Sequence, residues 1–545
     1  MTLDRPPVAA STTERTLERS RWDRDEAVPL AEATIGGLLA DRAEHQPDAP
    51  ALIGRRHGDS AEQRYTYGEL FTEARVVAAA LLRVAEPGDH VALLAPNVVE
   101  WPVIEYGAAL AGVVLVALNP ALGPHELTHA LTLSRASVLL HADTSRDIDL
   151  AGRVAQIRSD LPDLRETISL ADTDRLRADP TGPLDRATPT TPAMMQFTSG
   201  TTGKPKGVLL AHRSLVNNAR FTVITAEVPA GTAAIAPLPM FHTAACVIST
   251  LGPTWLGGAQ VLIEKFDPGD VLRTMVAEDA SVLFSVPTVL GAVLEAARRT
   301  EGPVPQLEAV LVGASTVPGS MIEAVEQTFG ASVHNLFGQT ELSPVLSLTR
   351  RSDSREDLVT KVGRPLPHTD AQIVDATTGE VLPIGVQGEI CARGYGQMIE
   401  YYDDPDATAT TVDPEGWLHT GDLGTMDARG LITVTGRLKE IIIRGGENIA
   451  PAEIEVALAG HPEVLQSAVV GLPDDHWGEI VGAAVVVREP GADGVEGRLE
   501  EFCRERLAKY KVPARWFVVD ELPTTASGKV QKFALRDQLL SGEPS

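Results

Sequence analysis

The chain has 545 residues, 43% of them hydrophobic and 22% charged, which predicts a folded protein with large hydrophobic cores and more than one domain. Its net charge of -27 repels phosphate backbones and anionic headgroups, which argues against nucleic acid or a polybasic membrane anchor. Three widely spaced cysteines, Cys246, Cys391 and Cys503, show neither a disulfide framework nor the spacing of a zinc site. We interpret them as reduced thiols in a cytoplasmic protein.

Residues 1–30 mix arginine with acidic residues and contain no apolar stretch, so we expect a flexible tail and no secretory signal. The longest apolar stretch, Tyr106–Leu118, has 13 residues, whereas a membrane-spanning helix needs about 20. Gly112 divides this stretch, which predicts the end of a helix, a turn and a buried strand. We therefore expect no membrane span.

From about Ile35 to about Gln339, helical segments alternate with short aliphatic strands, which predicts parallel sheets covered by helices. The expected helices are Gly68–Leu82 and Val99–Ala111. The expected strands are His90–Leu94, Val113–Leu118, Ser137–His141, Thr167–Leu170, Ala193–Phe197 and Ala309–Val312.

After Lys361 the pattern changes to short strands separated by glycine turns, which indicates a small barrel-like or antiparallel unit. Its strands are Ala371–Asp375, Gly388–Ala392 and Leu431–Thr435. A compact region of helix, strand, strand and helix follows a domain boundary at Leu438–Lys439. We expect an α/β fold, with a large N-terminal domain (31–438) of two helix-covered sheets plus the β-barrel-like unit, and a small α+β C-terminal domain (439–545).

The most informative segment is a loop of hydroxyls, glycines and lysines directly after the strand Ala193–Phe197. Unhindered backbone N–H groups can converge on phosphate oxygens there, and two lysines add positive charge. Pro205 stands where a Walker motif requires Ser or Thr, so this is a different phosphate loop. A plain surface loop is the alternative, which the length and context of the segment disfavour. The loop comprises Thr198, Ser199, Gly200, Thr201, Thr202, Gly203, Lys204, Pro205, Lys206 and Gly207.

Three further segments follow the phosphate loop in order. They read LFGQTE at 336–341, WLHTGDLG at 417–424 and PTTASGK at 523–529. With the loop, they resemble the acyl-adenylate-forming superfamily of AMP-dependent synthetases and ligases, and are most similar to fatty acyl-CoA synthetases. The resemblance covers about residues 35–535. It implies an ATP- and Mg²⁺-dependent ligase that activates a carboxylic acid as its acyl-adenylate and passes the acyl group to coenzyme A.

The resemblance also assigns the nucleotide site. Phe337 and Gly338 would lie against the adenine, Thr340 would bind phosphate, and Glu341 would hold Mg²⁺, for which a carboxylate is a natural hard ligand. The remaining nucleotide contacts are Gly313, Ala314 and Ser315 beside the adenine and acyl pocket, Asp422 at the ribose, and Arg437 at the ribose or phosphate. Gly436 precedes Arg437, where many relatives carry Asp.

A mobile C-terminal domain follows from the resemblance as well. Lys529 would bridge the α-phosphate and the incoming carboxylate during adenylation, supplying positive charge. The domain would then swing about Lys439 and present Gly445 and Gly446, which would leave room for the pantetheine arm. A plain exposed lysine and a glycine-rich hairpin are the alternatives.

His242 lies in a segment that resembles the wall of the acyl pocket, where it could orient the carboxylate, gate the pocket or simply fill space. Amino-acid-activating relatives carry Asp in this region, and Phe241–Cys246 contains no carboxylate. An α-amino acid is therefore disfavoured. Aliphatic residues near Val286–Leu290 and Leu336 favour a fatty or other apolar acid.

Three other functions stay open. One is an acyl-AMP ligase that loads a carrier protein, and another is a degenerate nucleotide-binding regulator, which the joint presence of Thr198, Glu341, Asp422, Arg437 and Lys529 disfavours. The third is a luciferase-like oxidation, against which no motif argues. The expected partners are the carboxylic acid, ATP and coenzyme A; a carrier protein and a second copy of the chain stay open.

Overall fold

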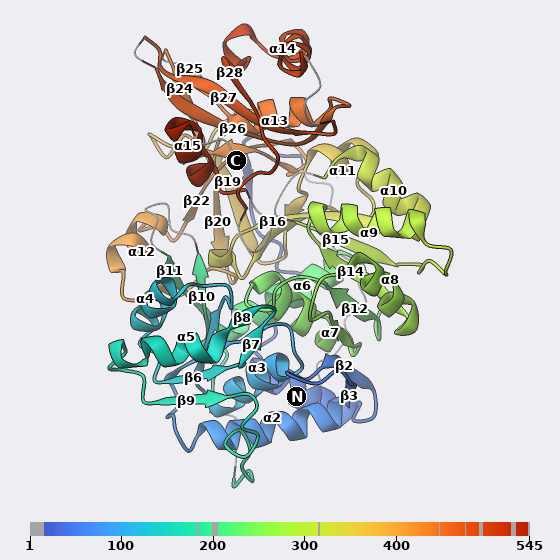
Figure 1. The fold of residues 1–545 in the computed structure, drawn as a ribbon, viewed down its shortest axis with the longest axis vertical. Helices are drawn as coiled ribbons and strands as arrows, with labels where there is room; N and C mark the ends of the chain where they lie inside the picture. The colour runs from blue at the N-terminus through green and yellow to red at the C-terminus, as the bar shows by residue number, and fades with distance from the viewer. Residues whose placement is uncertain are drawn as a thin grey trace.

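The computed structural model describes residues 16–182, 184, 186–198, 205–313, 317–445, 447–474, 476–489, 494–524 and 530–542, with residue 448 lacking a described side chain. Two large helix-covered sheets form the lower and middle parts of the molecule, and an antiparallel sheet and the C-terminal region lie above them (Figure 1). The expected α/β architecture is confirmed. Within the described ranges, no helix combines the length and apolar character that crossing a membrane requires.

A seven-stranded sheet has the order β21-β11-β10-β5-β4-β6-β9. Its strands from β10 to β9 are parallel, and β11 and β21 add an antiparallel edge. The predicted helices and strands of this region are confirmed to within one residue at each end. Their bounds are α1 Ile35–His45, α2 Tyr67–Leu81, β4 His90–Leu94, α3 Glu100–Ala111, β5 Val114–Leu118, α4 Pro124–Ser134, β6 Val138–His141, β7 Thr144–Ser145, β8 Ile148–Asp149, α5 Leu150–Ile157, η1 Arg158–Asp160, β9 Glu166–Ser169, β10 Pro192–Thr198, β11 Lys206–Ala211, α6 His212–Thr225 and β21 Glu400–Tyr401.

A nine-stranded sheet has the order β18-β17-β16-β15-β14-β12-β13-β2-β3, and its strands from β16 to β2 are parallel. This is the second of the two expected sheets. The bounds are β2 Pro50–Arg55, β3 Glu62–Thr66, β12 Ala233–Ala236, the π-helix η2 Ala244–Ser249, α7 Thr250–Leu256, β13 Gln260–Leu262, α8 Pro268–Ala277, β14 Ala280–Ser285, α9 Pro287–Arg299, β15 Ala309–Val312, α10 Gly319–Phe329, β16 Ser332–Gly338, η3 Thr340–Leu342, β17 Val345–Leu348, α11 Arg355–Thr360 and β18 Arg364–Pro365.

The two faces of the nine-stranded sheet belong to different hydrophobic cores. Leu311 packs with α6 and the seven-stranded sheet in the largest core. Val310 and Val312 point to the other face, where they pack against α8, α9 and α10. Side chains alternate between the faces of a strand, so one aliphatic strand serves both cores. This explains why the central strands read as continuous apolar runs.

Glu105 is an unusual group at the first of these cores. It lies on α3, is 2% exposed, and its carboxyl oxygens have no hydrogen-bond partner among the described residues. Burial holds the pKa of Glu105 well above its ordinary 4.5, because the charged carboxylate is poorly stabilised there. The nearby Cys246 thiol has a raised pKa for the same reason, burial, with a further contribution from Glu105.

We expect Glu105→Met to stabilise the protein by about 1–3 kcal/mol at pH 8, the cost of a buried group without a partner. At pH below 4.5 the carboxyl is protonated in both states, so its proton-linked penalty vanishes; the penalty grows as the pH rises and the unfolded chain releases the proton. Urea unfolding at pH 5 and pH 8 should show a larger gain at pH 8. A gain that shrinks at high pH would contradict this assignment.

The antiparallel unit is a five-stranded sheet of order β1-β19-β20-β22-β23. It is antiparallel as expected, but over the described residues it is open, with β1 and β23 as its edges. The bounds are β1 Arg21–Trp22, β19 Thr369–Val374, β20 Gly388–Gly394, α12 Pro405–Thr411, β22 Leu418–Met426 and β23 Ile432–Arg437.

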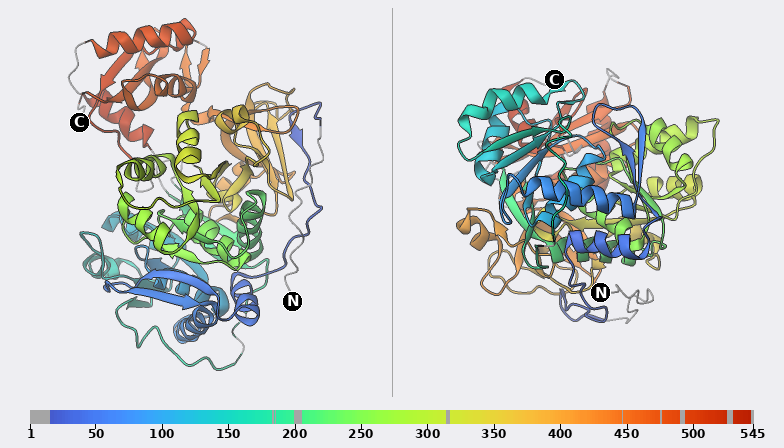
Figure 2. Two further views of the ribbon diagram at one scale, coloured as in Figure 1. Left: turned by 90° about the vertical axis from the view of Figure 1, so that its right-hand side faces the viewer. Right: turned by 90° about the horizontal axis from the view of Figure 1, so that it is seen from below.

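Part of the segment expected to be a flexible tail lies on this sheet. β1 pairs with β19, Trp22 is buried in the sheet's core, and the backbone N–H of Leu17 donates to Ala428. Figure 2 shows this stretch running along the outside of the antiparallel unit before the chain enters α1. Residues 1–15 lie outside the described residues.

The C-terminal region has its own sheet of order β25-β24-β27-β26, with β28 beside β27. The helix, strand, strand and helix expected after the glycine-rich segment are α13, β26, β27 and α14, and one more strand, β28, and one more helix, α15, follow them. The bounds are η4 Leu438–Glu440, β24 Ile442–Arg444, β25 Glu447–Ile449, α13 Pro451–Ala459, β26 Val464–Asp474, β27 Gly478–Val487, α14 Val495–Arg506, η5 Lys509–Lys511, β28 Arg515–Val518 and α15 Lys532–Ser541.

Candidate active site

The predicted phosphate loop joins two antiparallel strands at the edge of the seven-stranded sheet. β10 ends at Thr198 and β11 begins at Lys206, and these two residues face each other in the register. The loop therefore leaves the carboxyl end of a strand that is parallel to its neighbour β5, which is where open α/β sheets bind ligands. The predicted residues Ser199, Gly200, Thr201, Thr202, Gly203 and Lys204 lie outside the described residues.

Tyr401 connects this loop to the predicted metal ligand. The Lys206 Nζ lies 4.4 Å from the centre of the Tyr401 ring, a distance typical of cation–π contacts. The Tyr401 hydroxyl donates to Glu341 Oε1 at 2.7 Å. Burial and the neighbouring Glu341 raise the pKa of Tyr401, so the phenol remains a donor at neutral pH. A single chain of contacts thus runs from Lys206 to Glu341.

The segment that contains Glu341 turns sharply after β16. Glu341 is 7% exposed in η3, and Thr340 precedes it half-buried in the same turn. Phe337 is half-buried and packs against the core of the five-stranded sheet. A Cβ on Gly338 would lie 1.9 Å from the carbonyl oxygen of Pro344, so glycine is required there by the chain's own backbone. Gly338, which we expected to lie against the adenine, is thus also in close contact with the backbone at the start of β17.

The carboxyl ends of the parallel strands bring three further positions into one row. Ser285, Val312 and Asn335 are register partners on β14, β15 and β16, so Val286, Gly313 and Leu336 follow at the same edge. A Cβ on Gly313 would lie 2.4 Å from Leu336 Cδ1, so glycine lets these strands end side by side. Ala314 and Ser315 lie outside the described residues.

His242 lies beyond the end of β12 and immediately before the π-helix η2. Its backbone carbonyl accepts from Cys246 N at 3.0 Å, and Gln196 of β10 donates to the Cys246 sulfur at 3.3 Å. The predicted acyl-pocket segment therefore contacts the strand that leads into the phosphate loop. Burial lowers the pKa of His242 to about 4, so its imidazole is neutral at physiological pH.

Asp422 and Arg437 are brought together by the pairing of β22 with β23. They are register partners, and the Arg437 Nε lies 2.7 Å from Asp422 Oδ1. Asp422 is buried whereas Arg437 is exposed. A buried carboxylate whose orientation is fixed by a guanidinium suits the acceptance of two ribose hydroxyls, the task expected of Asp422.

The predicted hinge residue Lys439 lies between β23 and the C-terminal sheet, whereas Gly445 directly follows β24 of that sheet. Lys439 is exposed in η4, and its neighbour Glu440 forms an ion pair with Lys532 of α15 at 2.8 Å. Gly445 has a φ of +57°, and a Cβ there would lie 2.6 Å from the Trp477 ring. Glycine at 445 is thus required locally, against Trp477 and not against the nucleotide segments. Gly446 and Lys529 lie outside the described residues.

The sequence profile of the AMP-binding enzyme family matches residues 39–402, more than half of the chain, and that of the AMP-binding enzyme C-terminal domain matches residues 453–529. The chain belongs to this family. It is an AMP-forming acyl-CoA ligase, as the resemblance of its motifs implies.

Individual relatives cover nearly the whole ligase. A feruloyl-CoA synthase of an Amycolatopsis species is 36% identical over 92% of this chain and 98% of its own. The medium-chain acyl-CoA ligase ACSF2 of Danio rerio is 31% identical over 94% and 89%. The structure of an o-succinylbenzoate CoA synthetase of Bacillus subtilis with ATP and a magnesium ion is 29% identical, with a TM-score of 0.79 over 94% of this chain and 100% of that one.

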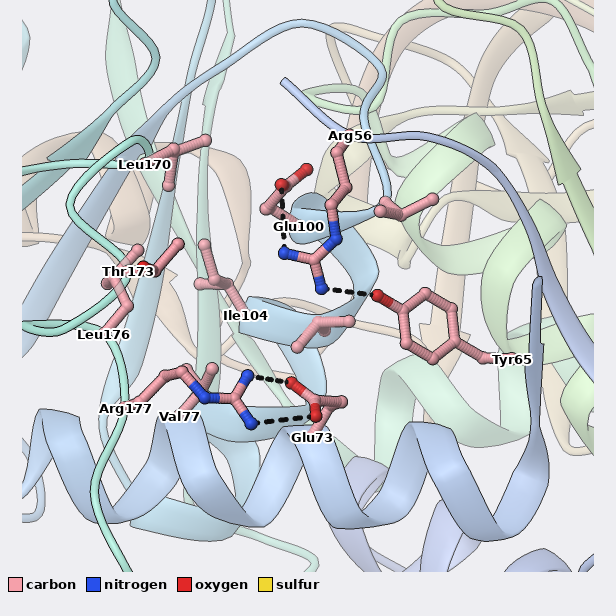
Figure 3. A pocket seen from close by; sticks show the side chains of 12 residues that line it. Arg56, Tyr65, Glu73, Val77, Glu100, Ile104, Leu170, Thr173, Leu176 and Arg177 are labelled. Carbon is pink, nitrogen blue, oxygen red and sulfur yellow. Dashed lines mark hydrogen bonds and ion pairs between the residues drawn. The ribbon is translucent and has the colours of Figure 1, made fainter. Parts of the chain in front are cut away.

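A cavity of about 50 Å³ lies away from all these segments, between α2, α3 and the loop after β9 (Figure 3). Its charged groups already pair with one another. Arg177 binds Glu73 through two hydrogen bonds, and Arg56 donates to the Tyr65 hydroxyl at 2.7 Å. None of the predicted site residues lines this cavity.

Sequence reasoning missed Tyr401, and its contacts make a prediction. Tyr401→Phe keeps the ring beneath Lys206 but removes the hydrogen bond to Glu341, and a hydrogen bond to a charged group contributes about 1.5–3 kcal/mol. We expect acyl-adenylate formation, measured as pyrophosphate release, to slow by about tenfold or more. The matched control is Tyr402→Phe, since Tyr402 contacts the His90 ring instead. Equal rates in the two variants would contradict a role for Tyr401.

Proposed function

We propose that this ligase activates an apolar carboxylic acid, aliphatic or aromatic, and that the acid lies at the carboxyl edge of the nine-stranded sheet. The observation that carries the proposal is the row of Val286, Gly313 and Leu336 at that edge. Phe241, Val286 and Leu336 are partly exposed apolar side chains that pack against the main core. They offer an acyl chain an apolar surface next to the nucleotide segments.

The charged groups near this edge favour the same class of acid. Phe241–Cys246 contains no carboxylate that could pair with an α-ammonium group. Burial lowers the pKa of His242 to about 4 and raises the pKa of Glu105, near Cys246, so it disfavours the charged form of each group. A second charge on the substrate would therefore find no fixed partner among these groups. The names of the relatives, feruloyl-CoA synthase and medium-chain acyl-CoA ligase, support both apolar classes.

The residues at the seven-stranded edge would receive the nucleotide. Thr198, Lys206 and the loop between them would bind the phosphates, while Asp422 and Arg437 would hold the ribose and Phe337 would cover the adenine. Glu341, buried and oriented by Tyr401, fits Mg²⁺, since a carboxylate oxygen is a preferred ligand of this ion. When bound, Mg²⁺ would offset the charge of the departing pyrophosphate.

Lys529 and the hinge would divide the reaction into two steps. Lys529 would approach the α-phosphate and the incoming carboxylate, and would stabilise the negative charge that develops as the carboxylate oxygen attacks. Rotation about Lys439 would then withdraw Lys529 and bring Gly445 and Gly446 to the site, so that coenzyme A reaches the acyl carbonyl. This assigns residues 31–438 to binding of ATP and the acid and residues 439–545 to a mobile domain. The three buried free cysteines favour a cytoplasmic location.

A panel of carboxylic acids tests the proposed substrate class. Pyrophosphate release is measured with fatty acids of increasing length, aryl acids, dicarboxylic acids and α-amino acids, each with coenzyme A, with a phosphopantetheinylated carrier protein, or with neither. We expect turnover of the fatty or aryl acids with coenzyme A. A preference for α-amino or dicarboxylic acids would overturn the proposed substrate class. Turnover only with the carrier protein would show that coenzyme A is not the acyl acceptor.

A substitution at the proposed acyl edge sharpens this test. Leu336→Ala removes three carbon atoms of apolar surface. Each missing methylene contact in an apolar pocket weakens substrate discrimination by about 1–3 kcal/mol. We expect the KM for the preferred acid to rise at least tenfold while the KM for ATP stays unchanged. Val276→Ala, on the exposed side of α8, is the control. An equal rise in the KM for ATP would place Leu336 at the nucleotide instead.

A further inference from the structure

Three side chains with metal-ligating atoms meet on one face of the five-stranded sheet, apart from Glu341. Cys391 on β20 and His419 on β22 are register partners. Glu389 lies two residues before Cys391, and side chains two apart on a strand point to the same face. The strand pairing therefore gathers a carboxylate, a thiol and an imidazole at one place.

The distances among these groups suit a single small ion. The His419 Nδ1 lies 3.4 Å from Cys391 Sγ and 2.8 Å from Glu389 Oε2, and the three ligand atoms all lie within 4.8 Å of one another. A tetrahedral Zn²⁺ with ordinary bond lengths to sulfur and nitrogen would separate those two atoms by about 3.5 Å. The sulfur–nitrogen distance is already close to that value, and the carboxylate needs to withdraw by about half an ångström.

His419 and Glu389 also make contacts with neighbouring groups that are typical of metal ligands in proteins. The other imidazole nitrogen, His419 Nε2, lies 3.6 Å from Asp413 Oδ2. Carboxylates in this position orient metal-binding histidines and fix their tautomer. The second oxygen of Glu389 accepts from the backbone N–H of Gly421 at 3.0 Å, so the carboxylate too is oriented.

The three side chains differ in solvent exposure, and the site is open to an ion on the side of His419. Cys391 is fully buried and Glu389 is 6% exposed, whereas the His419 side chain is 31% exposed. An ion could therefore enter beside His419 and keep a water as its fourth ligand. Sulfur, nitrogen and oxygen ligands together select Zn²⁺ or a similar transition-metal ion over Mg²⁺, which prefers oxygen alone.

We propose that Glu389, Cys391 and His419 bind one divalent transition-metal ion of the Zn²⁺ type, which braces β20 against β22 beneath the turn at Gly421 and Asp422. On binding, the Cys391 S–H bond breaks, its proton passes to solvent, and the thiolate ligates the ion. The imidazole proton resides on Nε2, facing Asp413, and Nδ1 becomes the second ligand. The Glu389 carboxylate supplies the third.

Cobalt spectroscopy on the full chain tests the site. The chelator-treated protein is titrated with Co²⁺, whose bond to a thiolate gives a charge-transfer absorption band in the near ultraviolet. We expect this band to saturate at one Co²⁺ per chain and to disappear when Zn²⁺ displaces the cobalt. Ions bound through oxygen alone, as at Glu341, do not give the band. Absence of the band, or its persistence under excess Zn²⁺, would overturn the proposal.

Variants assign the band to these ligands. We expect Cys391→Ala to abolish it, His419→Gln to weaken Co²⁺ binding more than tenfold, and Asp413→Asn to weaken it about 10–100-fold, the usual effect of losing an orienting carboxylate. Cys503→Ser, which alters another buried cysteine, should retain the band. Zn²⁺ should raise the melting temperature of the original protein but not of Cys391→Ala. A band that survives Cys391→Ala, or one lost equally in Cys503→Ser, would refute the site.

Discussion

Replacing Lys529 with alanine is expected to slow acyl-adenylate formation by roughly 10²–10³-fold while leaving thioester formation from supplied acyl-adenylate intact. The first half-reaction develops negative charge between the carboxylate and the α-phosphate, and loss of one fixed electrostatic contact in such a transition state costs on the order of 10²–10³ in rate. In the proposed second half-reaction coenzyme A takes the place of the lysine, so that step would not need this side chain. Pyrophosphate release measures the first step, and acyl-CoA formed from synthetic acyl-adenylate measures the second.

The matched control for Lys529→Ala is Lys509→Ala, which removes the same charge from an exposed position in η5. This control separates a specific contact from the general loss of positive charge in an acidic protein. It should retain both half-reactions. If Lys529→Ala slowed both steps equally, the division of labour between the two orientations of the C-terminal region would be wrong, although adenylation itself could still proceed in this ligase.

The parts of the fold and site that the sequence predicted are those set by local patterns. The strand leading into the phosphate loop and the aliphatic strand Ala309–Val312 are bounded by turn signals on both sides, and the structure confirms them. This is why a loop of glycine and threonine could be placed at the carboxyl end of β10 before any contact was known.

Contacts between distant segments could not be predicted in this way. Tyr401 and Glu341 are 60 residues apart, and no spacing indicates that β21 would join β11 and direct a phenol at that carboxylate. The polar composition of the N-terminal segment predicted a tail, yet β1 pairs with β19 because Trp22 finds a hydrophobic core there. The composition of a segment does not reveal whether another part of the chain offers it a hydrophobic surface to pack against.

The same reasoning explains the candidate transition-metal ligands. Zinc motifs are recognised by short spacings between Cys and His ligands on one turn or hairpin, and Cys391 has no second Cys or His at such a spacing. His419 lies 28 residues further on and is opposite Cys391 only because β20 and β22 are adjacent. The absence of a zinc motif therefore excludes sites built within one segment, but not a site assembled across two strands.

Replacing Glu341 with glutamine is expected to raise the Mg²⁺ concentration needed for half-maximal adenylation and to lower the rate at moderate Mg²⁺ by roughly 10²–10³-fold, the usual effect of losing one preorganised electrostatic contact. The substitution keeps an oxygen that can accept from the Tyr401 hydroxyl, so the turn in η3 should hold its shape. What changes is the charge of the ligand, since an amide oxygen binds a hard cation more weakly than a carboxylate does. Pyrophosphate release against Mg²⁺ at fixed ATP measures the effect.

Glu400→Gln is the matched control, because Glu400 is the exposed neighbour of Tyr401 and loses the same charge close to the site. Its Mg²⁺ dependence should equal that of the original protein. Raising Mg²⁺ should recover part of the activity of Glu341→Gln and none of the loss in Lys529→Ala, because the first variant lacks a ligand for the ion and the second a positive side chain at the reacting groups. If Glu341→Gln and Glu400→Gln showed the same Mg²⁺ dependence, the buried carboxylate would be bound to Tyr401 for structural reasons alone, and the ion would have to be held by ATP and other residues.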